Sequence, residues 1–469
     1  MKTRLLFSSL MTLVLFGLLV IFFSRCSREK GDFTISSADK ATAVAKVTIT
    51  QVEPQYVPDE LLVKFKEGAS ETARGKVLSK IKGFAKEKIQ THAMKHSGDN
   101  EGITLVSTQL DAREAVRQIK GSAEIEYAEP NWIYTSTTIA NDPYFVNGLL
   151  WGMMGTSTSP ANQFGCQAAA DWPTNTGSNT VYVGIIDEGY MYTHEDLAAN
   201  AGTNPYEIAG NRKDDDRNGY IDDVYGWDFV KNDNTVFDGL NDDHGTHVAG
   251  ILGAVGNNGK GVVGVCWKIK LLDAKFLGPA GGTTANAIKA IDYFTKLKLE
   301  GVNIVATNNS WGGGGYSSAL AAAIERANAA GILFIAAAGN SAVNIDNTPF
   351  YPAAYTNANI ISVASINSSG GLSYFSNYGA QHVALGAPGE GIWSCVPVYS
   401  KGKIVSGYAN YSGTSMATPH VTGAVALYAA SHPGATAATI KAAILANTIP
   451  TSSLTGKCVS GGRLSVIGF

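Results

Sequence analysis

Three separated segments carry the side chains of a nucleophilic acyl-transfer site. Asp187 follows the short apolar run 181–186, His244 opens the motif HGTHVAG, and Ser415 begins an apolar run that predicts a buried helix. A serine hydroxyl is a weak nucleophile at neutral pH, so it needs a base within hydrogen-bond reach and an acid that orients the base. The residue types and the setting of each together predict such a triad.

A tetrahedral intermediate also needs hydrogen-bond donors aimed at its oxyanion. Backbone N–H groups at a helix N-terminus are unpaired, so the Ser415 N–H is one candidate donor. Asn340 ends the segment AAAGN, and its side-chain amide is a second candidate. Taken singly, these residues have ordinary alternatives as caps or turn residues. A zinc site at His244 and His247 is disfavoured because the spacing HExxH is missing.

Composition favours a globular protein. The 469 residues are 45% hydrophobic and 16% charged, and the net charge is −3. Such a chain can bury a large core, which excludes a disordered protein. No long basic run is present, so we expect no nucleic-acid partner.

The N-terminus resembles a targeting segment. Lys2 and Arg4 precede the apolar stretch 5–23. This pattern predicts a signal peptide or membrane anchor over 1–26, followed by a polar spacer over 27–56. Cys26 is an alternative lipid acceptor, although Arg25 before it fits that use poorly. In each case the chain leaves the cytoplasm and is secreted or held in the cell envelope.

Four further cysteines leave two readings open. An oxidising compartment permits two disulfides with three possible pairings, whereas the alternative is four buried free thiols. These cysteines are Cys166, Cys266, Cys395 and Cys458.

The region 141–469 predicts an α/β fold. Predicted helices over 285–299 and 318–330 lead into apolar strands over 302–306 and 332–336, and 415–430 predicts a buried helix. This alternation is typical of a mostly parallel sheet with helices on both faces, which binds ligands at the carboxyl ends of its strands.

A smaller α+β unit precedes this region over 57–134. Its pattern alternates between strand and helix periods. It predicts strands over 60–65, 103–110 and 125–134, and helices over 70–81 and 111–120.

The region 141–469 resembles the subtilisin-like serine peptidases, the subtilase family. The resemblance implies that Asp187 orients His244 and stabilises its charge. His244 would then be the general base and later the general acid, and Ser415 the nucleophile. Asn340 and the Ser415 N–H would form the oxyanion hole.

The same resemblance implies a substrate groove. The segment SWGG would pair with an extended peptide, and glycines in 278–282 would form the opposing edge strand. These residues are Ser310, Trp311, Gly312, Gly313, Gly278, Gly281 and Gly282. The alternative is that these glycines belong to flexible loops. Ser341 places no acid at the pocket rim, which favours large apolar or aromatic side chains there.

One position departs from the family pattern. The family usually has serine or threonine after the catalytic aspartate, whereas this chain has Glu188. A second carboxylate beside Asp187 raises local pKa values or points to solvent, and it puts the pH optimum in question.

The unit over 57–134 resembles the inhibitory propeptide of this family, in the segments YVPDELLVKF at 56–65 and IEYAEPN at 125–131. The resemblance implies an intramolecular chaperone and inhibitor that self-cleavage releases between Tyr134 and Asn141. The alternative is an unrelated substrate-binding domain.

Calcium is the expected cofactor. A dense acidic loop resembles the start of an EF-hand, although Tyr225 stands where the terminal glutamate would fall; a solvated acidic loop is the alternative. Its candidate ligands are Asp214, Asp216, Asn218, Asp222 and Asp223.

Resemblance to thermitase-like members, which share the start NDPYF at 141–145, implies two more calcium sites. The tighter site would use the side chains of Asp142, Asp196 and Asn258 with the backbone carbonyls of Val255, Lys260 and Val262. The weaker site would use Asp228, Asp233 and Thr235.

Together these features predict a secreted or envelope-associated serine endopeptidase of broad specificity. We expect it to be made as a self-processed zymogen, to act through an acyl-enzyme on proteins or peptides, and to be a monomer. The alternatives are an inactive peptide-binding envelope protein and a maturation protease with narrow targets.

Overall fold

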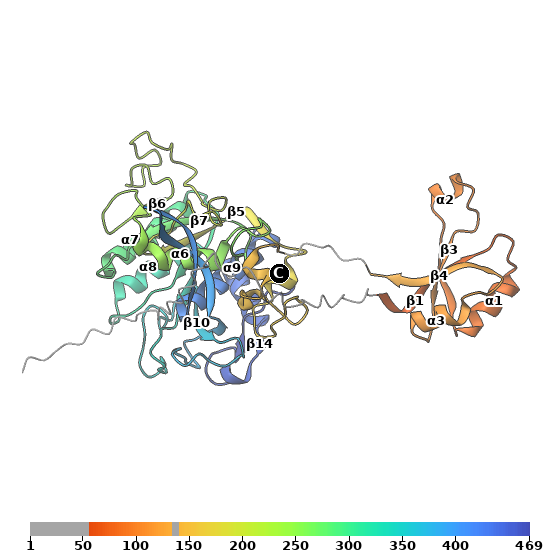
Figure 1. Ribbon diagram of the computed structural model, residues 1–469. Coiled ribbons are helices and arrows are strands. Elements are labelled where there is room, and N and C mark those ends of the chain that lie inside the picture. Colours follow the sequence, from red (N-terminus) through yellow and green to blue (C-terminus); the bar gives the residue numbers. More distant parts are fainter. Residues whose placement is uncertain (1–55, 134–139) are drawn as a thin grey trace, which may run out of the picture. The chain divides into compact units, whose positions relative to one another are not determined.

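The computed structural model describes residues 56–133 and 140–469, which form two compact units (Figure 1). The boundary between the units lies between residues 137 and 138. The predicted targeting segment, most of the spacer and Cys26 lie outside the described residues. No helix in the described ranges is long and apolar enough to cross a membrane.

The N-terminal unit is a four-stranded antiparallel sheet with three helices. The strand order is β2-β3-β1-β4, and buried Leu61, Val63 and Val106 form its core with residues of α1 and α3. Asp111 caps α3, as the sequence predicts, and Ser70 caps α1. The elements are β1 (Tyr56–Phe65), α1 (Glu71–Lys80), β2 (Phe84–Ile89), α2 (His92–His96), β3 (Ile103–Ser107), α3 (Ala112–Ile119) and β4 (Ile125–Trp132).

The C-terminal unit is built on a nine-stranded sheet. Its order is β14-β15-β11-β10-β9-β8-β5-β7-β6, and every pairing is parallel except that of β14 with β15. The strands are β5 (Gly177–Asp187), β6 (Gly226–Asp228), β7 (Lys268–Lys275), β8 (Ile304–Asn309), β9 (Leu333–Ala337), β10 (Ile360–Ile366), β11 (Leu385–Pro388), β14 (Ile449–Pro450) and β15 (Gly462–Arg463).

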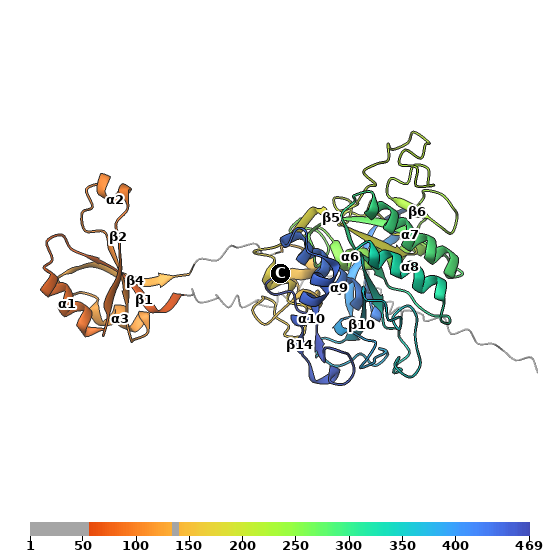
Figure 2. The same cartoon turned by 180° about the vertical axis from the view of Figure 1, so that it is seen from behind.

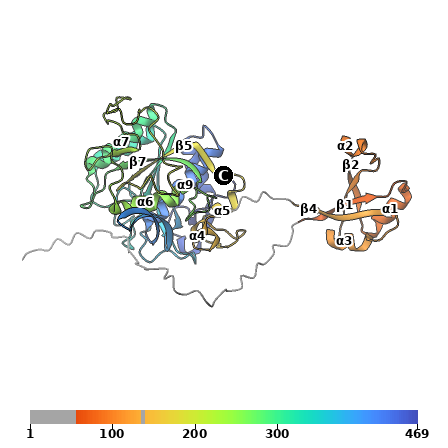
Figure 3. The same ribbon diagram turned by 45° about the horizontal axis from the view of Figure 1, so that its top comes forward.

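Helices cover both faces of this sheet, as predicted. Helices α6 and α9 pack together on one face, and α7 and α8 pack together on the other (Figures 1 and 3). Strands β8 and β9 are buried at every position, so the core is continuous through the sheet. The helices are α4 (Pro143–Val146), α5 (Ala168–Asp171), α6 (Asp243–Gly253), α7 (Thr284–Leu299), α8 (Ser318–Ala329), α9 (Thr414–Ser431) and α10 (Ala437–Ala446), with short 3-10 helices η1 (Trp151–Met153), η2 (Leu240–Asp242) and η3 (Ser452–Leu454).

The parallel arrangement places three strand ends at one edge of the sheet. β5 ends at Asp187, β8 ends just before Ser310, and β9 ends three residues before Asn340. Gly339 has a φ of 100°, a conformation that favours glycine, and it turns the chain after β9. The predicted site residues on these three strands therefore lie at the same edge.

A long antiparallel hairpin, β12 (Ile392–Ser400) with β13 (Lys403–Tyr411), packs against α6. The view from behind in Figure 2 shows α9 and α10 of the same unit. Cys166, Cys266, Cys395 and Cys458 are all free and buried. Of the two readings that the sequence left open, the structure has the free thiols.

Candidate active site

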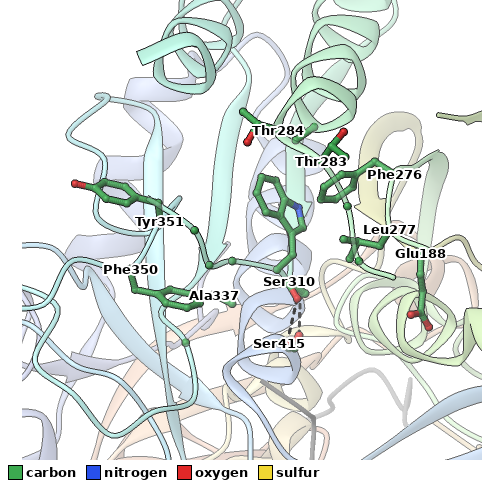
Figure 4. Close-up of a pocket in the computed structure, with 18 of the residues that line it drawn as sticks. Glu188, Phe276, Leu277, Thr283, Thr284, Ser310, Ala337, Phe350, Tyr351 and Ser415 are labelled. Carbon is green, nitrogen blue, oxygen red and sulfur yellow. Dashed lines mark hydrogen bonds between the residues drawn. The ribbon is translucent and has the colours of Figure 1, made fainter. Parts of the chain in front are cut away.

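Ser415 lies in the first turn of α9, a helix that is buried from Thr414 to Leu427. Its Oγ donates a hydrogen bond to the Ser310 carbonyl at 3.1 Å, and the Ser310 Oγ donates to the Ser415 carbonyl at 2.8 Å (Figure 4). This reciprocal pair joins the end of β8 to the start of α9. It fixes the serine beside the segment that the sequence assigned to substrate binding.

Asp187 and His244 are in direct contact. The Nδ1 atom of His244 lies 2.8 Å from Oδ1 of Asp187, whose side chain is fully buried at the end of β5. His244 stands in the first turn of α6, and its own side chain is 20% exposed. Because Asp187 engages Nδ1, the other ring nitrogen, Nε2, is left to interact with a serine or substrate.

Glu188 accepts the backbone N–H of His244 at 2.6 Å. Its carboxylate therefore holds the start of α6 and lies beside the imidazole instead of pointing away from the site. Burial raises the pKa of Glu188; the charge of His244 opposes this shift, and the charge of Asp187 adds to it.

The pKa of His244 is also raised above its ordinary value of 6.5. Burial acts against the charged imidazole, but the charge and hydrogen bond of Asp187 outweigh it, and the charges of Glu188 and Asp243 act in the same direction. The imidazole consequently holds its proton more tightly than a free histidine does.

Ser415 and His244 line the same groove, but no hydrogen bond joins them in the described catalytic unit. The serine hydroxyl points to Ser310 instead. A serine side chain moves between staggered positions by rotation about one bond, so this arrangement allows the hydroxyl to turn toward the imidazole. Catalytic hydrogen bonds are often formed only once substrate is bound.

Asn340 is held in a defined orientation by Thr414. Its Oδ1 accepts hydrogen bonds from the Thr414 N–H and Oγ1, both at 2.8 Å, and the Gly339 N–H donates to the same Oγ1 at 3.1 Å. Since the amide oxygen is engaged in this way, the amide nitrogen is presented to the groove that Asn340 lines. The arrangement suits a donor to an oxyanion.

The groove around these residues has a volume of about 650 Å³. It includes all seven residues that the sequence assigned to substrate binding, namely Ser310, Trp311, Gly312, Gly313, Gly278, Gly281 and Gly282. Three further aromatic side chains line it, and Figure 4 labels all of them: Phe276, Phe350 and Tyr351.

The opposing wall differs from the expected edge strand. The backbones of Gly278 and Gly281 hydrogen-bond to each other, at 2.8 and 3.2 Å, so this segment is a tight turn. Only Pro279 and Ala280 lie between these glycines, so the segment reverses direction and does not extend as a strand. The expectation of a strand here was wrong, although the segment does line the groove.

Only part of the predicted acidic loop converges. Carboxylate oxygens of Glu207, Asp216 and Asp223 lie within 4.8 Å of one another, the one such group among the described residues. Asp223 is fully buried, and its Oδ1 has no hydrogen-bond partner. Burial raises the pKa of Asp223 to about 6. A buried carboxylate oxygen without a partner fits a cation ligand.

The other loop residues act differently. Asp214 accepts the N–H groups of Asn218 and Gly219, and Asp222 accepts those of Asn211 and Arg212. These carboxylates therefore stabilise the loop backbone. The Asn218 side chain donates to Asp216 and Asp223, beside the cluster.

The residues of the expected tight calcium site come together. Asp142 and Asp196 are both fully buried, and Asp196 accepts the Asn258 side-chain amide at 2.9 Å and the Val262 N–H at 2.9 Å. Asp142 accepts the Asn257 N–H, but its Oδ1 has no partner.

Burial raises the pKa of Asp142 to about 6, and the charge of Asp196 adds to the shift. Val255 and Lys260 lie close to these residues. The Val255 N–H donates to the backbone carbonyl of Asp196, and the Lys260 N–H donates to Oδ1 of Asn258. Within the described residues neither carboxylate makes an ion pair, and two buried carboxylates in this state suit a divalent cation.

The weaker predicted site is less developed. Asp228 ends β6, is fully buried, and has one carboxylate oxygen without a partner. Its backbone pairs with that of Asp233 at 2.8 and 3.2 Å, whereas the Asp233 carboxylate accepts the Thr235 N–H at 2.8 Å. Backbone hydrogen bonds therefore bring Asp228 and Asp233 together, whereas the Asp233 carboxylate stabilises the turn that contains Thr235.

Sequence reasoning missed three residues of the site. Thr414 orients Asn340, Glu207 completes the acidic cluster, and Phe350 lines the groove. Thr414 stands next to Ser415, but its residue type alone does not indicate a role in orienting Asn340. Glu207 and Phe350 lie in irregular loops, and no local spacing in the sequence connects either of them to the site.

Comparisons with known proteins agree with this geometry. Residues 178–463 match the subtilase family of peptidases, and residues 42–131 match the fervidolysin N-terminal prodomain. Thermitase of Thermoactinomyces vulgaris is 35% identical over 328 residues, which cover 69% of this chain and 96% of that protein.

Two further proteins are similar over more of the molecule. An extracellular protease of Xanthomonas campestris is 30% identical over 471 residues, covering 94% of this chain and 78% of that protein. A solved protease structure from Pseudoalteromonas arctica aligns with a TM-score of 0.55 and 29% identity, over 70% of this chain and 98% of that one.

The chain has the fold, the edge-of-sheet site and the prodomain that these proteins share. The chain therefore belongs to the subtilase family of serine peptidases, and it is a subtilisin-like serine endopeptidase made with an N-terminal prodomain.

Proposed function

We propose that Ser415, His244, Asp187 and Asn340 carry out peptide-bond hydrolysis in this enzyme. The Ser415 Oγ attacks the scissile carbonyl carbon, and its proton passes to Nε2 of His244. Asp187, bonded to Nδ1, stabilises the imidazolium. The oxyanion accepts hydrogen bonds from the Asn340 amide and the Ser415 N–H.

Collapse of the tetrahedral intermediate completes acylation. The C–N bond breaks, His244 donates its proton to the leaving amine, and an ester joins the substrate acyl group to Ser415. Water, deprotonated by His244, then attacks the ester carbonyl, and the second collapse releases the acid and restores the serine. The 2.8 Å contact of His244 with Asp187, at the edge of the groove that Ser415 lines, is the observation that carries this proposal.

A fluorophosphonate probe tests the assignment, because it reacts covalently only with an activated serine. We expect wild-type enzyme to be labelled once, and Ser415→Ala to remain unlabelled and inactive. Ser431→Ala, at the exposed far end of the same helix α9, is the matched control and should label like wild type. Labelling that persists in Ser415→Ala would refute the assignment, and a folded wild-type protein that never labels would favour an inactive peptide-binding protein.

We further propose a broad specificity. Much of the groove wall is backbone, contributed by Gly278, Gly312 and Gly313, and main-chain pairing recognises an extended peptide with little regard to its sequence. Cleavage of a peptide library separates this proposal from a narrow maturation protease, which would cut only a few related sequences.

The residues before the catalytic unit serve export and control. The prodomain acts as an intramolecular inhibitor and is followed by the junction 134–141, where we propose self-cleavage. The segment 1–26 would direct the chain out of the cytoplasm as a signal peptide or membrane anchor, in keeping with an extracellular relative. We propose that the enzyme acts as a monomer because one chain supplies every residue of the site.

Calcium is the cation we propose for the two buried carboxylate groups. The first would be held by Asp142, Asp196 and Asn258, and the second by Glu207, Asp216 and Asp223. Each group contains a fully buried carboxylate oxygen without a hydrogen-bond partner, and hard oxygen donors are those that calcium prefers. A bound cation would stabilise the native fold without taking part in the reaction.

A further inference from the structure

Two glycine-containing segments face the groove beside Ser415. Gly312 follows Ser310 and Trp311, and Gly339 immediately precedes Asn340. A peptide that lies along 310–313 with its scissile carbonyl at Ser415 directs the side chain of the residue supplying that carbonyl between these segments. We call the space between Gly312 and Gly339 the primary slot.

The ring of Phe350 already lies in the primary slot. A Cβ atom built on Gly312 would lie 2.3 Å from Cε1 and 2.6 Å from Cζ of Phe350. A Cβ atom built on Gly339 would lie 2.9 Å from the same Cε1 and 3.0 Å from Cδ1. One ring therefore packs against the bare backbone of both walls, and each wall needs glycine to admit it.

The backbone around this ring is held in place. The Gly313 N–H donates to the Tyr351 carbonyl at 2.8 Å, and the Ala354 N–H donates to the Phe350 carbonyl at 2.9 Å. The Tyr351 ring packs on Tyr355, with centroids 4.5 Å apart. Figure 4 shows the two neighbouring rings extending from this segment in different directions, with Phe350 near Ala337 of β9.

We propose that Phe350 is a specificity-determining residue that fills the primary slot and limits the enzyme to bonds preceded by glycine, alanine or serine. The inference rests on the proposed function and restricts its broad specificity at one substrate position, the residue that supplies the scissile carbonyl. It reverses the preference for large apolar side chains that Ser341 suggested from the sequence.

The size of the effect follows from packing. An aromatic substrate side chain could enter only by displacing a ring that contacts both walls, and close-packed sites resist added volume. A mismatch of even one methylene group changes kcat/KM by about 10- to 200-fold, so exclusion of a whole ring should reach at least the lower end of that range.

Tetrapeptide p-nitroanilides that differ only in their last residue, alanine or phenylalanine, test the proposal on the mature enzyme. We expect wild type to prefer alanine by about 10-fold or more in kcat/KM. Phe350→Gly should raise the ratio of kcat/KM for the phenylalanine substrate to kcat/KM for the alanine substrate by about 10-fold or more. Phe350→Leu should give an intermediate ratio.

Tyr374→Ala, which removes an aromatic ring that is 78% exposed, is the control and should keep the wild-type ratio. A wild type that cleaves the phenylalanine substrate as fast as the alanine substrate overturns the inference, whether or not Phe350→Gly folds. A Phe350→Gly variant that has the melting temperature of wild type and still prefers the alanine substrate also overturns the inference. Fluorophosphonate labelling of Ser415 is measured in parallel, because its absence would count against the catalytic assignment and not against Phe350.

Discussion

At the level of single residues, the site differs from its family pattern through the carboxylate of Glu188. This side chain accepts the His244 N–H at 2.6 Å, and its charge adds to that of Asp187 in raising the pKa of His244. Serine or threonine at this position would supply no charge. Glu188 therefore raises the pKa of His244, and it also positions the backbone of that residue.

The pH dependence of activity should reveal this tuning. His244 accepts a proton only when it is neutral, and a raised pKa means that it stays protonated to higher pH. We expect kcat/KM to rise with pH along a limb centred above 6.5, the ordinary histidine value. Glu188→Gln keeps a hydrogen-bond acceptor but removes the charge, so it should move this limb to lower pH by up to about one unit. An unmoved limb in Glu188→Gln would show that the charge has no such role.

Thr414 should contribute to catalysis through Asn340. Thr414→Val removes the hydroxyl that binds Asn340 Oδ1 but keeps the backbone N–H that binds the same atom. We expect kcat to fall with KM little changed, by less than the factor of about 100 to 1,000 expected for Asn340→Ala. The double variant should be no slower than Asn340→Ala alone.

Thr418→Val is the matched control for that experiment. It removes another buried hydroxyl one turn further along α9, and within the described part of the chain this hydroxyl bonds only to the Thr414 carbonyl. If Thr414→Val slows the enzyme no more than Thr418→Val does, Thr414 has no positioning role.

At the level of elements, the loop between β5 and β6 carries most of the proposed calcium chemistry. The loop contains Asp196, Glu207, Asp216 and Asp223, and buried Tyr190 and Leu197 join it to the core. Hydrogen bonds from Asp214 and Asp222 to backbone N–H groups shape its turns. A cation that neutralises its buried carboxylates would supply the remaining stability.

Chelation should therefore lower the melting temperature of the mature enzyme, and added calcium should restore it, because the ion binds only the native state. Asp142→Asn and Asp223→Asn should each reduce the calcium-dependent part of the melting temperature. Asp292→Asn, which breaks an exposed ion pair with Arg326, should leave the calcium dependence unchanged. Identical melting in excess chelator and in calcium would refute both sites.

Regular elements were predictable because their periodicity is local. The strand ending at Asp187, helices α7, α8 and α9, and the cap Asp111 all follow from apolar spacing or cap chemistry. Strand β2 was not predicted, since FAKEKI is almost wholly exposed and has no apolar face.

Contacts made through irregular loops were not predictable in the same way. Phe350 reaches Gly312 and Gly339, and Glu207 reaches Asp216 and Asp223, only after the chain has folded. The turn at Gly278 was mistaken for a strand because glycine permits both conformations. Local sequence therefore located the triad but not the shape of the pocket beside it.

At the level of the whole molecule, two independently cored units on one chain imply an ordered maturation. The prodomain has its own buried cluster around Leu61, Val63 and Val106, and the catalytic unit has a separate, larger core. A large parallel sheet folds slowly because its contacts are distant in sequence, so a covalently attached folding aid has a physical use.

Wild-type protein should lose its N-terminal unit by cleavage between residues 134 and 141, whereas Ser415→Ala should remain a full-length precursor. N-terminal sequencing of both proteins is the measurement. Addition of a trace of wild-type enzyme to the Ser415→Ala precursor distinguishes intermolecular cleavage from self-cleavage. A Ser415→Ala protein that matures by itself, in the absence of other proteases, would contradict autocatalysis.

The four free thiols of the catalytic unit give this enzyme an internal reporter of its own unfolding. All four are at most 3% exposed, and burial raises the pKa of Cys166 and of Cys266 to about 12, so almost no thiolate is available in the folded state. Iodoacetamide should consequently modify the mature catalytic unit only as fast as that unit unfolds, and mass spectrometry should find molecules with either none or all of its four thiols modified. Calcium should slow that modification. Reducing agents should leave peptidase activity unchanged, because packing stabilises this fold where disulfide bonds stabilise many secreted proteins.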